Sequence, residues 1–175
     1  MNSKLFLSLL LASAMALQVQ AQTHHSVGAS WSFMGFNSTY SKNSEKQTFG
    51  TLGLQYEYRF SELIALNANL GWAHSWFGPD ANPQYAYPLK DNAILVLAGC
   101  DVKWLRRGSL ELHSGIAGGM DIRVQQNKRG TYTTMGLAGQ FDAVGIRLNR
   151  NHAYLDLSTG WGSMGCIRLG AGYRF

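Results

Sequence analysis

The chain has 175 residues, a formal net charge of +5 and a sequence pI of about 9.4. Its length is that of one domain of ordinary size. The lysine and arginine residues are scattered along the chain rather than clustered, so the basic pI does not indicate a nucleic-acid-binding surface. We therefore expect no nucleic-acid partner.

The first residues have the pattern of a secretory signal peptide. Lys4 supplies a positive start, residues 5–17 form a short apolar run, and Val19-Gln20-Ala21 is a small-residue cleavage site. The apolar run is shorter than the roughly 20 residues that a membrane-spanning helix needs. We predict that residues 1–21 are a cleaved signal peptide and that residues 22–175 form a single exported domain.

From residue 26 onward the chain alternates apolar and polar side chains, as a β-strand with two different faces does. Strands are predicted over residues 26–36, 51–60, 64–72, 94–104, 110–123, 135–148, 153–161 and 165–175. The connections between them fall at residues 37–47, 61–62, 77–91, 106–108, 125–130, 149–151 and 163–165. The apolar parity of the sixth strand changes at Val144, which predicts a β-bulge near Ala143.

The even number of strands and the alternation of long and short connections are typical of bacterial outer-membrane barrels. The sequence thus predicts an all-β fold, an eight-stranded antiparallel up-and-down transmembrane β-barrel in the cell outer membrane. Both termini and the short turns would lie in the periplasm. A soluble lipocalin-like barrel is the alternative, but it would place its apolar side chains inside around a ligand.

The last strand keeps its apolar alternation to the final residue, where Tyr173 and Phe175 are aromatic. A transmembrane barrel must pair its last strand with its first, because an open edge in lipid leaves backbone groups unsatisfied. Aromatic side chains at a strand end also fit the interfacial girdle of such barrels. We predict a barrel-closing strand that the barrel-assembly machinery uses during biogenesis.

Six of the ten acidic residues and five of the basic residues fall on the glycine-rich, polar faces of the strands. Acidic and basic side chains are nearly balanced there and can pair inside a small barrel, whereas a lysine or arginine facing the bilayer midplane would cost roughly 2–4 kcal/mol. Arg147, near the parity change, is a further candidate. The sequence therefore predicts a plugged interior with a charge network of Glu57, Arg59, Asp101, Lys103, Glu111, His113, Asp121, Arg123, Asp142, Asp156, Arg168 and Arg174.

Candidates for chemistry are few. His113 and Ser114 suggest a hydrolase pair, but neighbours on a strand point to opposite faces and cannot approach to the roughly 3 Å that general-base catalysis needs. Cys100 and Cys166 are expected on opposite walls, beyond the roughly 7 Å limit for a disulfide. We expect no enzymatic activity, no cofactor and no metal site.

Several segments of the last third resemble the small outer-membrane β-barrel domain family of Bacteroidetes-type bacteria. The residues that carry the resemblance are Gly145-Ile146-Arg147-Leu148, Asn151-His152, Gly160-Trp161-Gly162 and Gly170-Ala171-Gly172-Tyr173-Arg174-Phe175. The family is related in architecture to OmpA/OmpX-type eight-stranded barrels. The resemblance implies a fold and a location, and none of its motifs is catalytic.

The expected function is an envelope-structural or surface-interaction role. Passage of small solutes and modification of membrane lipid are the alternatives. The expected partners are outer-membrane lipid and an extracellular ligand that binds through the loops, and the barrel is expected to be a monomer. Residues 37–47, 77–91, 125–130 and 163–165 are expected to be exposed outside the cell. The loop at residues 77–91 is the candidate recognition loop, because its three prolines restrict its conformation and Tyr85 and Tyr87 offer contact area. A solvated loop with no partner is the alternative.

Overall fold

The structure is a computed structural model that describes residues 25–33, 46–77, 90–127 and 130–175. The predicted signal peptide (residues 1–21) and the predicted recognition tyrosines, Tyr85 and Tyr87, lie outside the described residues. No helix in the described ranges is long and apolar enough to cross a membrane.

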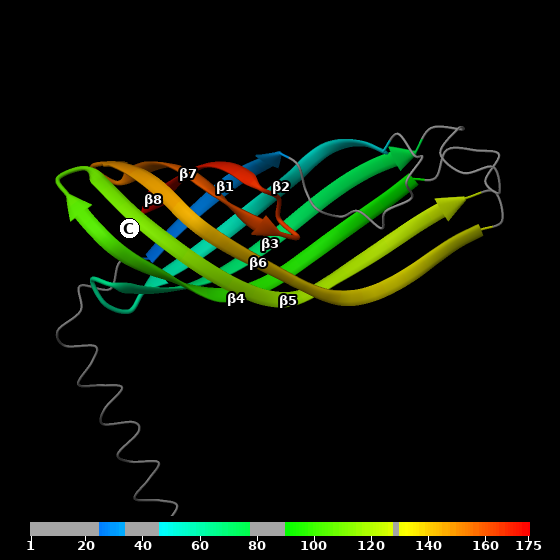
Figure 1. The fold of residues 1–175 in the computed structure, drawn as a ribbon, viewed down its shortest axis with the longest axis horizontal. Coiled ribbons are helices and arrows are strands. Elements are labelled where there is room, and N and C mark those ends of the chain that lie inside the picture. Colours follow the sequence, from blue (N-terminus) through cyan, green and yellow to red (C-terminus); the bar gives the residue numbers. More distant parts are fainter. Residues whose placement is uncertain (1–24, 34–45, 78–89, 128–129) are drawn as a thin grey trace, which may run out of the picture.

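The described residues form one closed barrel in which each strand pairs antiparallel with the next and the last pairs with the first. This confirms the predicted eight-stranded up-and-down architecture (Figure 1). The strands are β1 (His25–Phe33), β2 (Lys46–Arg59), β3 (Ile64–Phe77), β4 (Lys90–Arg107), β5 (Leu110–Asn127), β6 (Gly130–Arg150), β7 (Ala153–Gly162) and β8 (Ile167–Arg174).

The connections separate into two ends of the barrel. The turns after β2, β4 and β6 lie at the same end as His25 and Phe175, and β1, β3, β5 and β7 end at the other, which we call the outer end (Figure 1). Asn151, in the turn after β6, has a positive φ of 54°. That left-handed conformation suits a tight turn, and asparagine tolerates it better than most side chains do.

The predicted bulge is confirmed. The pairing between β6 and β7 shifts register between Asp142 and Val144, on either side of Ala143. On the other side of β6, the pairing with β5 shifts between His113 and Gly115. The extra residue restores the outward direction of the apolar side chains after the bulge.

The predicted loop at residues 125–130 is wrong. Residues 125–127 belong to β5 and pair with the start of β6, where Gln125 lies opposite Tyr132 and Asn127 opposite Gly130. In this part of the β5–β6 hairpin both faces of the strands have polar residues. The alternation of apolar and polar side chains from which strands are predicted is therefore missing. Threonine and tyrosine nevertheless favour extended structure there.

The predicted exposed link at residues 163–165 is also corrected. Met164 is only 1% exposed, and Gly165 is buried. The Met164 amide donates to Gln140 Oε1 at 3.0 Å, Gln140 Nε2 donates to the Gly165 carbonyl at 3.1 Å, and Ser32 Oγ donates to the Met164 carbonyl. Because these polar groups hold the backbone on both sides, the link folds into the barrel mouth instead of projecting from it.

The strands are strongly staggered around the barrel. Ser26, near the start of β1, pairs on one side with Arg174, near the end of β8. On its other side Ser26 pairs with a residue of β2, and the paired position can be followed from each strand to the next. It moves toward the outer end through Glu57, Asn67, Gly99, Ala117 and Gln140 to Gly162. As a result β5 and β6 extend well beyond β7, β8 and β1 (Figure 1).

Candidate functional site: the barrel interior and the protruding wall

Arg147 occupies the centre of a charged layer in the half of the barrel nearest the short turns. Its side chain is 1% exposed. Nη1 lies 2.6 Å from Glu57 Oε2, and Nε lies 2.8 Å from Asp156 Oδ2. Glu57 is on β2 and Arg147 on β6, so the first contact crosses the interior between strands that are not neighbours.

Further ion pairs extend this layer. Arg59 Nη2 lies 2.9 Å from Glu111 Oε2, Lys103 Nζ lies 3.4 Å from Glu111 Oε1, and Lys103 also bonds Glu57. His113 Nε2 lies 2.9 Å from Asp156 Oδ2. A buried charge is tolerated when it is paired and hydrogen-bonded, so these residues stabilise one another's burial. The connected cluster, which we call the charged layer, is Glu57, Arg59, Lys103, Glu111, His113, Arg147 and Asp156.

The remaining predicted interior charges are distributed along the barrel. Arg168 bonds Asp142, and Arg168 Nε donates to Ser158 Oγ at 3.2 Å. Closer to the outer end, Arg123 Nη2 lies 2.6 Å from Asp121 Oδ2. Asp101 is 3% exposed and Arg174 is half-buried; neither takes part in the ion pairs found among the described residues.

Glycines make room for the large interior side chains. The Tyr154 ring lies beneath the Arg147 guanidinium, whose Cζ is 4.5 Å from the ring centroid. A side chain at Gly28 or Gly172 would overlap that ring, and one at Gly145 would overlap the His113 imidazole. The glycines on the inward faces are therefore a packing requirement of the layer.

An apolar layer separates the charged layer from the outer end. It consists of Leu95, Leu97, Ala117, Ala138 and Met164. Met164 enters from the β7–β8 link and packs where a side chain at Gly53 or Gly71 would collide with it. The alternation of the strand predicted at residues 94–104 puts Leu95 and Leu97 on the same face as Asp101 and Lys103, but it does not identify Met164. The sequence signal that could have identified Met164 is the pair Gly53 and Gly71. These glycines leave space inside the barrel, and the β7–β8 link contains one large apolar side chain that can fill it.

The His113–Ser114 pair is split between the two faces, as the strand geometry predicts. His113 is 2% exposed inside the barrel, whereas Ser114 is on the outer face. Ser114 Oγ donates to the Ala143 carbonyl at 2.5 Å and accepts from Trp104 Nε1 at 3.2 Å. The serine thus satisfies a backbone carbonyl that the β6 bulge leaves without a strand partner.

The closing strand ends in reciprocal contacts with the start of β1. The Phe175 amide donates to the His25 carbonyl at 2.9 Å, and the His25 amide donates to the Phe175 carbonyl at 3.1 Å. The two rings stack with centroids 5.9 Å apart. Tyr173 stacks on His152 at 5.5 Å. The final residues therefore seal the β1–β8 seam at the end that bears the short turns.

A second aromatic group lies toward the outer end of the same wall. The ring centroids of Trp31 and Phe33 are 3.9 Å apart, and those of Trp31 and Phe49 are 5.7 Å apart. Trp31 Nε1 donates to the Phe49 carbonyl at 2.9 Å. Exposed aliphatic side chains such as Leu54 and Leu169 lie between the two groups. An apolar band bordered by two aromatic girdles is the outer surface of a membrane-spanning barrel.

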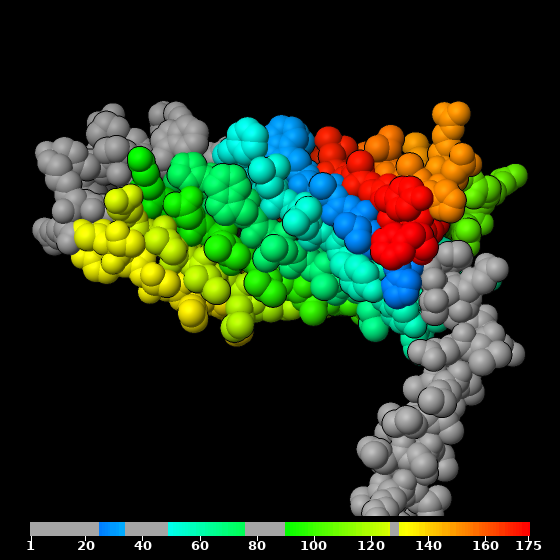
Figure 2. All heavy atoms as spheres, turned by 180° about the vertical axis from the view of Figure 1, so that it is seen from behind, coloured from blue at the N-terminus to red at the C-terminus, as the bar shows by residue number. Residues whose placement is uncertain are grey.

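The wall formed by β5 and β6 protrudes at the outer end. β7 pairs with β6 only from Gln140 onward, and Ser163 hydrogen-bonds to the Gly139 backbone, so residues 131–138 pair with β5 alone among the described strands and their other side is an edge. Met135 is 74% exposed and Leu137 is 94% exposed on this segment. Figure 2 shows β5 and β6, in yellow, reaching past the blue β1 and the red β8. We call residues 131–138 the free edge of β6.

The fold has counterparts among solved structures. Ail, the attachment invasion locus protein of Yersinia pestis, solved in complex with the heparin analogue sucrose octasulfate, matches with a TM-score of 0.52 at 15% identity, over 89% of this chain and 100% of that one. The N-terminal β-barrel domain of Pseudomonas aeruginosa OprF matches with a TM-score of 0.52 at 13% identity, over 89% and 100%.

Comparison at the level of sequence identifies no relative. No protein-family model matches the chain, and no curated protein matches it. The structural matches, at their low identity, establish the fold alone. The chain has the eight-stranded barrel fold found in the outer-membrane proteins Ail and OprF.

Proposed function

We propose that this protein is an integral outer-membrane barrel whose function is to bind a partner at the cell surface. The apolar band, its two aromatic girdles and the fold shared with outer-membrane barrels support the location. Within this class, we propose from the motifs near the C-terminus that the chain is a member of the small outer-membrane β-barrel domain family. Assembly would use the barrel-assembly machinery, and the closed β1–β8 seam supports a monomer.

The observation that carries the surface-binding role is the free edge of β6. A strand edge presents unpaired backbone N–H and C=O groups that can pair with an extended segment of another protein. Proteins often protect such an edge with proline or lysine, and residues 131–138 contain neither. The edge stands at the outer end, where β3 ends and β4 begins. We propose the predicted recognition loop with Tyr85 and Tyr87 as a second binding element.

The filled interior supports a binding role over passage of solutes. In eight-stranded barrels the interior is just wide enough for side chains to fill. Here the charged layer crosses the lumen at Arg147 and Glu57, and the apolar layer follows above it. A plugged, non-enzymatic barrel is thus our proposal, and the pairing of His113 with Asp156 gives that histidine a structural role.

The proposal is tested by shortening the β5–β6 hairpin without changing its register. Deleting Val124 and Gln125 together with their partners Thr133 and Tyr132 removes two paired positions and keeps the inward–outward alternation. The matched control is Arg107→Gln, an exposed change at the opposite end of the barrel. Cells that display equal amounts of folded wild-type or variant protein are compared for adhesion to immobilised matrix proteins and to heparin.

Heparin is included because Ail was solved with a heparin analogue, and a sulfated glycan is therefore the first non-protein ligand to try. We expect wild-type and Arg107→Gln cells to adhere above the level of cells without the protein, and the shortened hairpin to lose that increment. Equal adhesion of cells with and without the protein would contradict a surface-binding role. If the shortened variant still adheres like wild type, the partner binds to the loops and not to the free edge of β6.

A further inference from the structure

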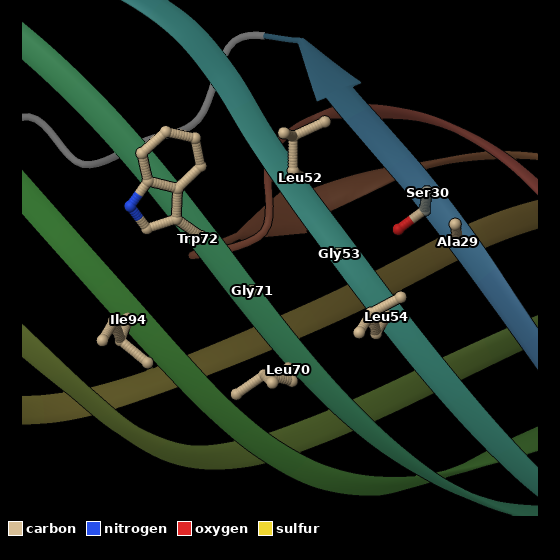
Figure 3. A pocket seen from close by; sticks show the side chains of 9 residues that line it. All are labelled: Ala29, Ser30, Leu52, Gly53, Leu54, Leu70, Gly71, Trp72 and Ile94. Carbon is tan, nitrogen blue, oxygen red and sulfur yellow. The ribbon is translucent and has the colours of Figure 1, made fainter.

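A hollow lies on the outer face of the barrel, across β1 to β4, and has a volume of about 530 Å³. Figure 3 shows the side chains of Leu52, Leu54, Leu70, Trp72 and Ile94 around the strand backbones at Gly53 and Gly71, with Ala29 and Ser30 at one margin. The volume falls within the range of about 300–1,000 Å³ that is usual for small-molecule sites. We call this hollow the outer groove.

The outer groove opens to the surroundings of the barrel and not to its interior. Leu54 is 58% exposed, Leu70 48% and Trp72 46%. The corresponding space inside the wall is occupied by Met164, which packs against Gly53 and Gly71. The lining of the groove is almost entirely apolar. A strongly polar ligand would lose its hydrogen bonds with water there and gain none from the protein.

The groove becomes polar at its outer rim. Trp72, which lines the groove, stacks on His74 with ring centroids 6.2 Å apart and an interplanar angle of 21°. His74 Nδ1 and Asn92 Oδ1 are hydrogen-bonded at 2.8 Å, on the outward face of the neighbouring strands β3 and β4. One outward position further along β4, Lys90 is exposed and adds a positive charge.

We propose that the outer groove binds one acyl chain of a phosphate-bearing membrane lipid, with the lipid headgroup against His74, Asn92 and Lys90. Along the wall, the apolar groove is followed by an indole ring, then by a hydrogen-bonded polar pair and then by a cation. A phosphate-bearing lipid has its groups in the same order, from the apolar acyl chain to the charged phosphate. The groove is continuous with the apolar band around it, so its occupant comes from the bilayer. This inference rests on the proposed membrane location.

The test measures the lipid that stays with the protein after it leaves a bilayer. Wild-type protein is reconstituted into nanodiscs of dimyristoyl phosphatidylglycerol and dimyristoyl phosphatidylcholine, transferred to a mild detergent and examined by native mass spectrometry. Ala29→Phe fills the groove from its margin, because Ala29 points outward. The matched control, Ala98→Phe, adds the same ring on the outward face of β4, outside the groove.

We expect the wild-type protein and Ala98→Phe to retain one phospholipid, and Ala29→Phe to lower the retained fraction about tenfold, equivalent to about 1.4 kcal/mol of binding free energy. Lys90→Gln should lower retention of the phosphatidylglycerol relative to the phosphatidylcholine. Equal retention by the two phenylalanine variants overturns the inference, and so does a wild-type dimer that Ala29→Phe dissociates. Wild-type protein that enters nanodiscs but retains no lipid overturns this inference alone; failure to enter nanodiscs overturns the membrane location as well.

Discussion

Arg147 on β6 donates a hydrogen bond of 2.6 Å to Glu57 on β2, across the interior of the barrel. The two strands are not neighbours, so this contact ties together walls that the backbone ladder does not connect directly. The same guanidinium holds Asp156 at 2.8 Å and stacks on Tyr154. Loss of either partner leaves the other buried charge with fewer opposite charges, since Glu57 would keep Lys103 and Arg147 would keep Asp156.

Arg147→Met should therefore destabilise the folded barrel by about 3–5 kcal/mol, the usual cost of removing one partner from a buried ion pair. Glu57→Gln should also be destabilising. The double variant should be less destabilised than the sum of the two, because the Arg147–Glu57 interaction is lost only once. Equilibrium urea unfolding in lipid vesicles, followed by tryptophan fluorescence, measures all three.

The control for this cycle is Arg107→Met, which removes an exposed arginine at the end of β4. Exposed changes of this kind usually stay within about 0.5 kcal/mol of wild type. Strictly additive effects of Arg147→Met and Glu57→Gln would show that the two residues do not interact energetically.

Ser114→Ala tests how the bulge in β6 is accommodated on the outer face. The substitution removes the donor that satisfies the Ala143 carbonyl and the acceptor for Trp104 Nε1. We expect a loss of about 1–3 kcal/mol in the free energy of unfolding, the cost of leaving a desolvated polar group unpaired. Ser109→Ala, in the exposed turn between β4 and β5, is the control and should be near neutral. Equal stability of the two variants would refute the role of Ser114.

Met164→Ala should leave a cavity beneath the outer end. Met164 is 1% exposed and packs in the apolar layer, so truncation should cost about 2–5 kcal/mol. The same substitution at Met135, which is 74% exposed, should have a much smaller effect. Thermal unfolding of both variants in the same detergent gives the comparison. A Met164→Ala barrel as stable as wild type would mean that the link is not held inside.

Conductance should be near background for the wild-type barrel, because two layers of side chains cross the lumen. Planar-bilayer recording provides the measurement, and bilayers without the protein give the background. A large and reproducible wild-type conductance would favour the small-solute pore over the surface-binding barrel.

Removal of the last residue should impair assembly more than a change of its side chain does. Deleting Phe175 removes both reciprocal backbone hydrogen bonds with His25 as well as the stacked ring, whereas Phe175→Asp removes only the ring. Phe175→Tyr keeps both and serves as the control. The measurement is the fraction of heat-modifiable, membrane-embedded protein. Wild-type levels for the deletion would show that the seam closes without its last pair.

Three features could be predicted: the number of strands, their inward and outward faces, and the bulge. All three depend on an alternation with a period of two residues, which can be recognised within a few neighbouring residues of the sequence. Arg147 could be placed only near the parity change, since its central role depends on Glu57, a residue far away in the chain. Met164 was missed for the same reason: its neighbours Gly53 and Gly71 come from other strands. The polar end of the β5–β6 hairpin has no apolar face, so no alternation marks it.

The inward fold of the β7–β8 link has a consequence for how this surface can change over time. Antibodies and phages select for sequence drift at exposed sites of a bacterial surface protein, but Met164 and Gly165 are out of their reach and are held by Gln140 and Ser32. Substitutions in residues 163–165 would lower the amount of folded protein without changing a surface that an antibody can bind. We therefore expect this link to keep its length and its large apolar residue in lineages whose other outer connections diverge.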